Sequence, residues 1–161
     1  MLTAELTKLS KKLIMDCQRS HIKIATAESC TGGLLASYLT SIPGSSDIFE
    51  RGYITYSNDA KVEMLGVPSD MILTLGAVSP DVAIAMCEGA LKKASVHLTV
   101  AVTGIAGPGG GTSEKPVGTV NIASARLGGP TLNECHIFNG NRDQVRQSSV
   151  KEAINMMLKQ I

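Results

Sequence analysis

The sequence predicts an α/β fold, a three-layer α/β/α sandwich around a mostly parallel, mixed sheet. Segments with helical periodicity alternate with short β-branched segments along most of the chain, which is typical of helices that cover both faces of a parallel sheet. Two strand-like segments then follow one another without a helix between them, which indicates an antiparallel member of that sheet. No repeat, linker or low-complexity tract interrupts the 161 residues, so we expect a single domain over residues 1–161.

The first half of the chain predicts an amphipathic helix followed by alternating strands and helices. Leucines recur at helical spacing from Leu2 to Leu13, so we expect this helix to bury a leucine stripe in the core. Asn58 is expected to cap a later short helix. The elements expected between them are a strand over 22–27, a helix over 32–41, a loop over 41–47 and a strand with period-two alternation over 51–57.

The second half contains the clearest helix of the sequence, over residues 78–95. Ser79 is its expected N-cap and Pro80 its first residue, because proline at that position sacrifices no hydrogen bond. Lys92 and Lys93 lie near its end, where the helix dipole favours a cation. The other elements expected are a buried strand over 96–102, a glycine-rich loop over 103–116, strands over 117–125 and 132–138, and a helix over 141–161.

The composition argues against two classes of partner. Lys and Arg total 15 and Asp and Glu total 14, so a formal net charge of +1 provides no basic field to attract nucleic acid or an anionic membrane. Aromatic residues make up 3% of the chain, too few for a platform on which bases stack. We therefore expect neither nucleic acid nor a membrane surface as a partner.

The cysteines and histidines are scattered without the spacing of metal ligands, so we expect no metal and no other cofactor. The N-terminal stretch carries several lysines on its leucine pattern, which fits neither a signal peptide nor a membrane span. These features favour a reducing, cytoplasmic location. The scattered residues are Cys17, Cys30, Cys87, Cys135, His21, His97 and His136.

Polar residues and glycines gather over residues 28–33, where an expected strand meets an expected helix. A helix N-terminus with glycines can hold an anion, and a side chain on a sharp strand-to-helix turn can be presented as a nucleophile. The pattern of this joint is compatible with both chemistries. Its residues are Glu28, Ser29, Cys30, Thr31, Gly32 and Gly33.

The glycine-rich loop over residues 103–116 matches neither common nucleotide-binding motif. In a P-loop, lysine is followed by Ser or Thr and a helix, whereas Lys115 is followed by Pro116 and a strand pattern. A dinucleotide fingerprint needs a third glycine where Thr112 stands. Two interpretations stay open. The loop is either a mobile connection between strands, or its glycines, including Gly107, let backbone N–H groups approach a ligand.

Ser29, Cys30 and Thr31 are the candidate nucleophiles. A hydroxyl nucleophile needs an activating base because it is almost wholly protonated at neutral pH. The histidines lie in a turn or beside apolar strands, where a structural role is favoured over that of a base. Lys61 is the alternative base, because burial lowers a lysine pKa and the first turn of a helix disfavours a cation. Cys30 is expected to be inert packing beside the turn.

Three charged residues each have two interpretations. Glu28 either orients Lys61 or Thr31, or satisfies N–H groups at the start of the following helix. Arg142 and Arg146, one helical turn apart, either bind a phosphate group or solvate a helix face. Because Arg142 lies at the start of its helix, where a cation is disfavoured, we favour phosphate binding.

Four segments stand out together, namely TAESCTGG, GYITYSNDAKVEMLGV, TGIAGPGGGTSEKPVGTV and FNGNRDQVR. With them, essentially the whole sequence resembles the C-terminal-domain family of competence/damage-inducible protein A (CinA), whose members include nicotinamide-mononucleotide deamidase. The resemblance implies an α/β/α fold and a metal-free amidohydrolase that converts nicotinamide mononucleotide and water to nicotinate mononucleotide and ammonia. Two positions depart from the family's pattern, since Arg51 stands where relatives commonly have glycine and Asn141 where they commonly have aspartate.

Carried over by position, the resemblance implies that Ser29 is the nucleophile and Lys61 its general base. Tyr56, in the same YSN block, is expected to be a third catalytic residue. Thr103 and Gly104 would line the pocket opposite the turn. The substrate-binding residues expected from the resemblance and the motifs together are Glu28, Thr31, Gly32, Thr103, Gly104, Gly107, Arg142 and Arg146.

One alternative function stays open, that of a non-catalytic nucleotide-binding regulatory module linked to competence or the response to DNA damage. A pure binding module needs neither a nucleophile nor a base, so the presence of Ser29, Tyr56 and Lys61 favours an enzyme. The expected partners are the small-molecule substrate nicotinamide mononucleotide and further copies of the chain in a homo-oligomer.

Overall fold

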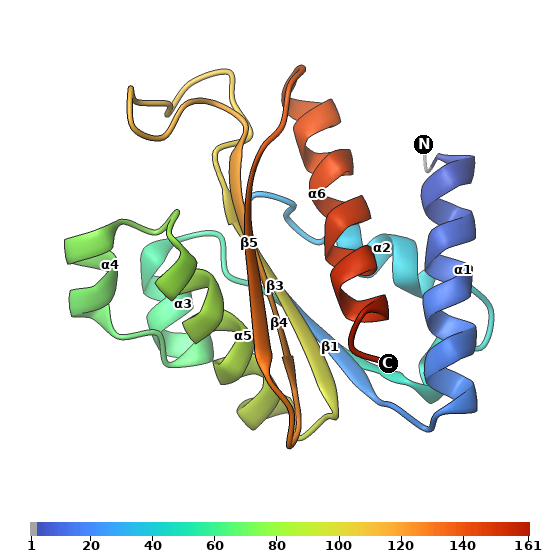
Figure 1. Cartoon of the computed structure of the whole chain (residues 1–161). Helices are drawn as coiled ribbons and strands as arrows, with labels where there is room; N and C mark the ends of the chain where they lie inside the picture. Colours follow the sequence, from blue (N-terminus) through green and yellow to red (C-terminus); the bar gives the residue numbers. More distant parts are fainter. Residues whose placement is uncertain (1–2) are drawn as a thin grey trace.

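Residues 3–161 are described by a computed structural model, in which helices cover both faces of one sheet (Figure 1). The strands are β1 (Ile24–Glu28), β2 (Phe49–Ile54), β3 (Leu98–Gly104), β4 (Thr119–Arg126) and β5 (Thr131–Ile137). Their order in the sheet is β2-β1-β3-β4-β5. β1 is parallel to β2 and β3, whereas β4 is antiparallel to β3 and β5, so among the described strands β4 alone runs against the others. The predicted mixed, mostly parallel sheet is confirmed.

The helices form two layers, one on each face of the sheet (Figure 1). They are α1 (Ala4–Arg19), α2 (Leu34–Thr40), α3 (Asn58–Leu65), α4 (Ser69–Leu75), α5 (Pro80–Ala94) and α6 (Arg142–Leu158), with a short 3₁₀ helix at Ser45–Asp47. One layer contains α1, α2 and α6, and the other contains α3, α4 and α5. Alternate residues of β3 pack into opposite layers, Val100 and Val102 toward the first and Ala101 toward the second.

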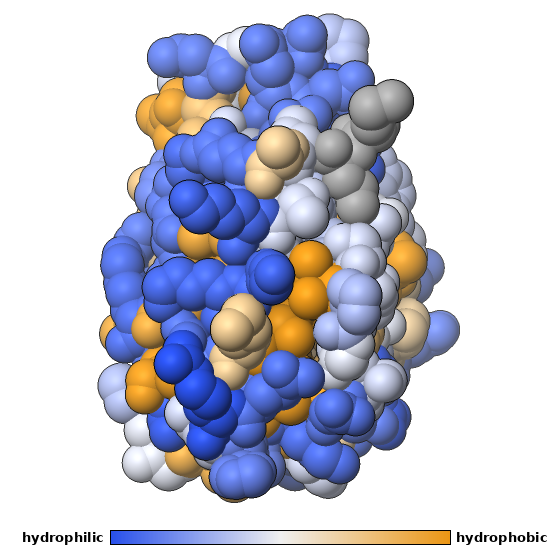
Figure 2. Space-filling model, turned by 90° about the vertical axis from the view of Figure 1, so that its right-hand side faces the viewer, coloured by the Kyte–Doolittle hydropathy of each residue, from blue (hydrophilic) through white to orange (hydrophobic). Residues whose placement is uncertain are grey.

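α1 confirms the leucine pattern of the N-terminal segment. Leu6 and Leu13 are buried and Leu9 is partly buried, while Leu2 lies outside the described residues. Figure 2 views the side of the molecule on which α1 lies, and most of that surface is hydrophilic, as expected for the outer face of an amphipathic helix. No helix within residues 3–161 combines the length and apolar character needed to cross a membrane.

Two expectations about element boundaries are corrected, and one helix has no predicted counterpart. β2 begins at Phe49, two residues before the predicted start, because pairing with β1 at Ile24 sets its register. It is a largely exposed edge strand, so its sequence has little apolar pattern from which its limits could be predicted. Ser57, rather than Asn58, caps α3, since Ala60 N–H donates to Ser57 Oγ at 3.0 Å. The seven-residue helix α4 was not expected, because so short a segment has little helical periodicity.

α5 and α6 begin at caps that the sequence displays. Val82 N–H donates to Ser79 Oγ at 3.3 Å, and Pro80 is the first residue of α5, as predicted. At α6, Gln144 N–H donates to Asn141 Oδ1 at 3.0 Å and Asn141 N–H donates to Gln144 Oε1 at 2.8 Å, which is a capping box. Asparagine caps a helix about as well as aspartate, so Asn141 keeps the helix start in place.

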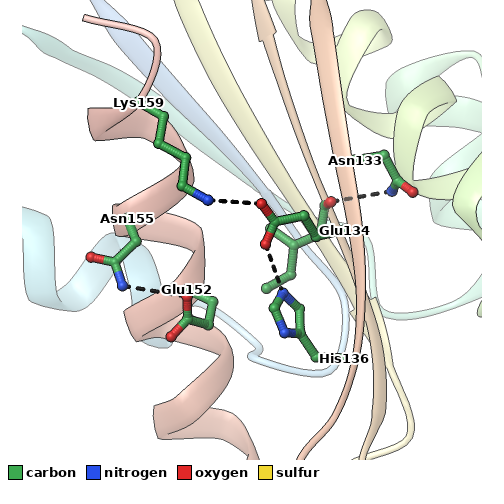
Figure 3. A network of polar contacts seen from close by, with 7 residues as sticks. Asn133, Glu134, His136, Glu152, Asn155 and Lys159 are labelled. Carbon is green, nitrogen blue, oxygen red and sulfur yellow. Dashed lines mark hydrogen bonds and ion pairs between the residues drawn. The ribbon is translucent and has the colours of Figure 1, made fainter.

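The end of α6 is tied to β5, at the edge of the sheet (Figure 3). Lys159 Nζ, just after α6, donates to Glu134 Oε1 of β5 at 2.8 Å, and His136 Nε2 lies 3.2 Å from Glu134 Oε2. The hydrogen bond from Lys159 lowers the pKa of Glu134 from its usual value. These contacts hold α6 along the sheet, and with it the arginines near the start of that helix.

Candidate active site

The chain turns sharply between β1 and α2, and this turn presents Ser29. Ser29 N–H donates to Val102 C=O of β3 at 2.9 Å, which keeps the chain in line with the sheet. Gly32 N–H then donates to Ser29 C=O at 3.0 Å and closes a tight turn. Gly32 and Gly33 have φ values of +56° and +92°, which glycine adopts at little cost. Ser29 is thereby placed where β1 and β3 end.

A buried carboxylate secures the turn to α2. Glu28, the last residue of β1, is 1% exposed. Its oxygens accept hydrogen bonds from three amide N–H groups, those of Gly33 at 3.0 Å, Leu35 at 3.0 Å and Ala36 at 2.9 Å. A carboxylate at this position also complements the positive end of the helix dipole. Of the two interpretations of Glu28, the geometry supports the one in which it satisfies helix N–H groups.

Lys61 reaches Ser29 from α3, although the two residues are 32 positions apart in the sequence. The lysine is 1% exposed, and its Nζ lies 3.0 Å from Ser29 Oγ. Nζ also donates to Thr55 C=O at 2.8 Å and lies 3.4 Å from Ser57 C=O. Both carbonyls belong to the connection between β2 and α3, so the end of β2 and the start of α3 together aim the amine at the serine.

Burial lowers the pKa of Lys61 from its usual value, because the ammonium ion loses hydration. The surroundings suit the neutral amine. A neutral amine has two N–H bonds and one lone pair, so if the carbonyls of Thr55 and Ser57 accept the two N–H bonds, the lone pair is left for the hydroxyl proton of Ser29. This arrangement can accept the serine proton.

A cavity of about 310 Å³ opens in front of this pair. Its lining residues are Ser29, Cys30, Tyr56, Asn58, Lys61, Ala77, Val78, Thr103, Gly104, Ile105, Ala106, Gly107, Gly109, Gly110 and Arg142. None of these residues carries a carboxylate, whereas Lys61 and Arg142 are basic. Thr103 Oγ1 donates to Ala77 C=O at 2.8 Å and fixes one wall of the cavity. A small cavity with basic and backbone donors is suited to an anionic ligand.

Arg142, the first residue of α6, connects two sides of the cavity rim. Its NH1 donates to Gly107 C=O at 2.8 Å and its NH2 donates to Tyr56 Oη at 2.9 Å. Tyr56 is 61% exposed, so its ring lies at the mouth of the cavity rather than in its floor. Arg142 thus fixes the position of Gly107, in the glycine-rich loop, relative to the β2–α3 connection.

Four of the residues expected to bind substrate lie outside the cavity lining. Arg146 extends behind the Ser29 turn, where its NH2 donates to Thr31 C=O at 2.8 Å. Thr31 is fully buried, Gly32 shapes the turn, and Glu28 is held by the N–H groups of α2. Direct contact of these four residues with a ligand therefore has no support from the geometry.

Cys30 lines the cavity beside Ser29, but burial raises the pKa of its thiol to about 11 and disfavours the nucleophilic thiolate.

Three residues that line the cavity were not predicted from the sequence, namely Asn58, Ala77 and Val78. The sequence predicts Asn58 as a helix cap, and its polar side chain directly after Tyr56 and Ser57 is the signal that points to the site. Ala77 and Val78 have no local signal, because only the packing of the α4–α5 connection brings them to the site.

No group of three or more His, Cys, Asp or Glu side chains within the described part of the chain is arranged to hold a metal ion. The polar side chains that line the cavity include the hydroxyl group of Ser29, the amine of Lys61 and the guanidinium of Arg142.

Comparison with known proteins adds a second line of observation. The model of the CinA C-terminal domain matches residues 6–161. The chain belongs to the CinA C-terminal domain family. Within this family, it is 45% identical over 162 residues to the nicotinamide-nucleotide amidohydrolase PncC of Escherichia coli K12, with 99% of this chain and 97% of PncC covered.

Other members of the CinA family are longer. A CinA-like protein from Akkermansia muciniphila is 47% identical over 150 residues, which cover 93% of this chain and 36% of that protein. The chain thus spans about a third of the length of such relatives. The crystal structure of the competence/damage inducible protein CihA from Agrobacterium tumefaciens superimposes with a TM-score of 0.96 at 42% identity, covering 99% of this chain and 97% of that one. The CinA fold is therefore shared.

Proposed function

We propose that this chain is an amidohydrolase that deamidates nicotinamide mononucleotide to nicotinate mononucleotide and ammonia. The observation that carries the proposal is the buried pair of Ser29 Oγ and Lys61 Nζ, 3.0 Å apart at the floor of a cavity. The similarity to PncC over nearly the full length of both chains supports the choice of substrate. An amide is a fitting target, because its carbonyl carbon accepts a serine nucleophile once a base removes the hydroxyl proton.

The reaction proceeds in two halves. Ser29 Oγ attacks the carboxamide carbon while Lys61 Nζ takes the hydroxyl proton, and the carbonyl π electrons move to the oxygen. Collapse of the tetrahedral intermediate breaks the C–N bond, and the leaving nitrogen takes the proton from Lys61 to depart as ammonia. A water molecule then attacks the acyl-enzyme with Lys61 again as base, which releases nicotinate mononucleotide and restores Ser29.

The rest of the cavity is assigned to binding. Arg142 binds the phosphate group, because Gly107 C=O and Tyr56 Oη use two of its five N–H donors and others are left for a ligand. Tyr56 lies beside it at the mouth and contacts the substrate there. Thr103, Gly104 and Gly107 form the wall opposite the Ser29 turn.

The alternative of a non-catalytic nucleotide-binding module accounts for the cavity but not for Lys61. Burying a lysine with a depressed pKa costs stability, and no carboxylate lines the cavity to offset that cost. A module that only binds a nucleotide gains nothing from an amine aimed at a serine hydroxyl. A cytoplasmic location and a homo-oligomeric state stay predictions.

The test is incubation of the purified chain with nicotinamide mononucleotide, with ammonia release measured before and after treatment with EDTA. We expect turnover that EDTA leaves unchanged, because the chemistry needs only Ser29, Lys61 and backbone N–H groups. Tight binding of the mononucleotide without ammonia release would favour the binding module. Loss of turnover on chelation, restored by zinc, would contradict the mechanism.

A further inference from the structure

Arg146 of α6 carries a cation that the proposed mechanism does not use. Its side chain is 27% exposed, and its Nε is buried with no acceptor within residues 3–161. The nearest carboxylate oxygen recorded for it, Asp143 Oδ1, lies 3.8 Å from NH1 on a side chain that is 79% exposed. The hydrogen bond from NH2 to Thr31 C=O is much shorter, at 2.8 Å. The buried Nε without an acceptor and the long distance to Asp143 leave this half-buried cation weakly paired, so its position behind the Ser29 turn needs an explanation.

A chain of hydrogen bonds leads from this guanidinium to the cavity. Arg146 donates to Thr31 C=O, and the N–H of that same peptide group, which belongs to Gly32, donates to Ser29 C=O at 3.0 Å. The next N–H in the series is that of Cys30, in the peptide group of the Ser29 carbonyl. Within the described residues, Cys30 N–H has no hydrogen-bond acceptor in any other residue, and its one recorded contact is with the thiol of Cys30 itself.

The geometry of the peptide groups sets the direction in which this last N–H points. Both peptide groups in the series are trans, so each N–H points away from its own C=O. Because Ser29 C=O points into the turn, toward Gly32 N–H, Cys30 N–H points out of the turn. Cys30 lies next to Ser29 in the cavity lining, and from this position we infer that its N–H faces an atom bound there.

We propose that Cys30 N–H is the oxyanion donor of the reaction, and that Arg146 is a positioning residue that holds and polarises this donor through two peptide groups. Hydrogen bonds in series strengthen one another by roughly 10–30% per bond, and a cation at the head of the series adds to the polarisation. The benefit is greatest in the transition state, because charge accumulates on the carboxamide oxygen as Ser29 attacks.

This inference rests on the proposed function and selects the Ser29 turn, rather than the glycine-rich loop, as the source of an oxyanion donor. It has two direct consequences. The side chain of Cys30 is dispensable, because only its backbone N–H acts. Arg146 supports the rate of the chemical step and not the binding of the phosphate, in contrast to Arg142.

The test compares the variants Arg146→Lys, Arg146→Gln and Arg146→Met with wild type and with Lys151→Met. Lys151 is a matched control, because it is a cation of the same helix that pairs with Glu5 far from the turn. Ammonia release gives kcat and KM for nicotinamide mononucleotide, and kcat/KM for the riboside that lacks the phosphate. Thermal melting reports whether each variant is folded at the assay temperature.

We expect Arg146→Met to lower kcat by about 10- to 100-fold, a part of the 10²–10³ that a whole oxyanion donor contributes. KM for the mononucleotide should stay within about twofold, and kcat/KM for both substrates should fall by the same factor. Activity should decrease in the order Arg146→Lys, Arg146→Gln, Arg146→Met. Lysine retains both the charge and the hydrogen bond to Thr31 C=O, whereas glutamine retains only the hydrogen bond. The midpoint of the pH–rate profile should not move, since Lys61 is untouched.

Three results would overturn the inference. One is wild-type kcat in Arg146→Met. Another is a KM that rises for the mononucleotide while the riboside is unaffected, which would return Arg146 to the phosphate site. If Arg146→Met does not fold, Arg146→Gln decides, and wild-type kcat in that variant is the third result. Failure of the proposed function itself is distinct, because wild-type protein would then release no ammonia.

Discussion

At the scale of single residues, the proposed reaction depends on one contact between a serine and a lysine. Neither side chain is reactive in water at neutral pH, since the hydroxyl is protonated and the amine is charged. Burial of Lys61 changes this, because it lowers the lysine pKa while Thr55 C=O and Ser57 C=O orient the amine. Reactivity is thus a property of the environment that these residues share.

Replacing Ser29 by alanine should lower turnover of nicotinamide mononucleotide by at least about a thousandfold, as expected when a covalent nucleophile is removed. The fold should be intact, because the backbone N–H of residue 29 still bonds Val102 C=O. Ammonia release and a melting curve measure both effects. Cys30→Ala is the control and should keep most of the activity, so an inactive Cys30→Ala beside an active Ser29→Ala would reverse the assignment.

The pH dependence of the rate should follow Lys61. The base must be neutral to accept the serine proton, so kcat should rise with pH through the lowered lysine pKa and then level off. Lys61→Arg should be inactive at every pH tested, because a guanidinium stays protonated. A chemistry-limited rate that is flat from about pH 6 to pH 9 would argue against Lys61 as the base.

At the scale of elements, each side chain to which we assign a function lies at the end of a strand or the start of a helix. Ser29 follows β1, Lys61 lies in the first turns of α3, and Arg142 begins α6. The ends of these elements carry unpaired backbone groups that side chains or ligands can use. The Ser29 turn is the most constrained of these joints, because Glu28 binds the N–H groups of α2 on one side and Arg146 binds Thr31 C=O on the other.

Glu28→Gln should lower the free energy of unfolding by about 1–3 kcal/mol, because an amide has one acceptor oxygen, whereas the carboxylate has two that accept from three backbone N–H groups. Urea denaturation measures this change. Glu63→Gln, on the exposed face of α3, is the matched control and should change stability little. Equal stabilities of the two variants would contradict the capping role of Glu28.

At the scale of the whole molecule, the cavity exists only because segments far apart in the chain converge. Its walls come from the Ser29 turn, the β2–α3 and α4–α5 connections, the glycine-rich loop and the start of α6. These segments all lie near the ends of β1, β2 and β3, where ligands bind in open α/β sheets. Arg142 joins two of them, since it donates to both Gly107 C=O and Tyr56 Oη.

If Arg142 binds the phosphate group, removal of that group from the substrate should lower turnover. Nicotinamide riboside should be a poor substrate of wild-type protein, and Arg142→Ala should damage turnover of the mononucleotide far more than that of the riboside. The loss of activity from removing the phosphate and the loss from Arg142→Ala should not add, because both changes delete the same contact. Kinetics of both proteins on both substrates measure this coupling. If Arg142→Ala lowers turnover of both substrates by the same factor, Arg142 does not bind the phosphate, and the backbone N–H groups around Gly109 and Gly110 become the candidate phosphate site.

Much of the fold follows from local patterns in the sequence. The leucine spacing of α1, the Ser79–Pro80 start of α5 and the cap at Asn141 are interactions within a few residues, so the sequence alone displays them. β2 begins two residues and ends three residues before the predicted strand, and α4 has no predicted counterpart, because an exposed edge strand and a seven-residue helix take their limits from their neighbours.

The candidate site, like the fold, depends partly on features that the sequence displays and partly on the tertiary structure. The sequence by itself determined which chemical groups are present and, through four family segments, that Ser29 and Lys61 belong together. Only the tertiary structure decided which side of the Ser29 turn each charged residue occupies. Arg142 and Arg146 are one helical turn apart and equivalent by pattern, yet one lies at the cavity rim and the other behind the turn. The physical reason is that the packing of α6 against the sheet sets the direction of each side chain, and helical periodicity does not specify it.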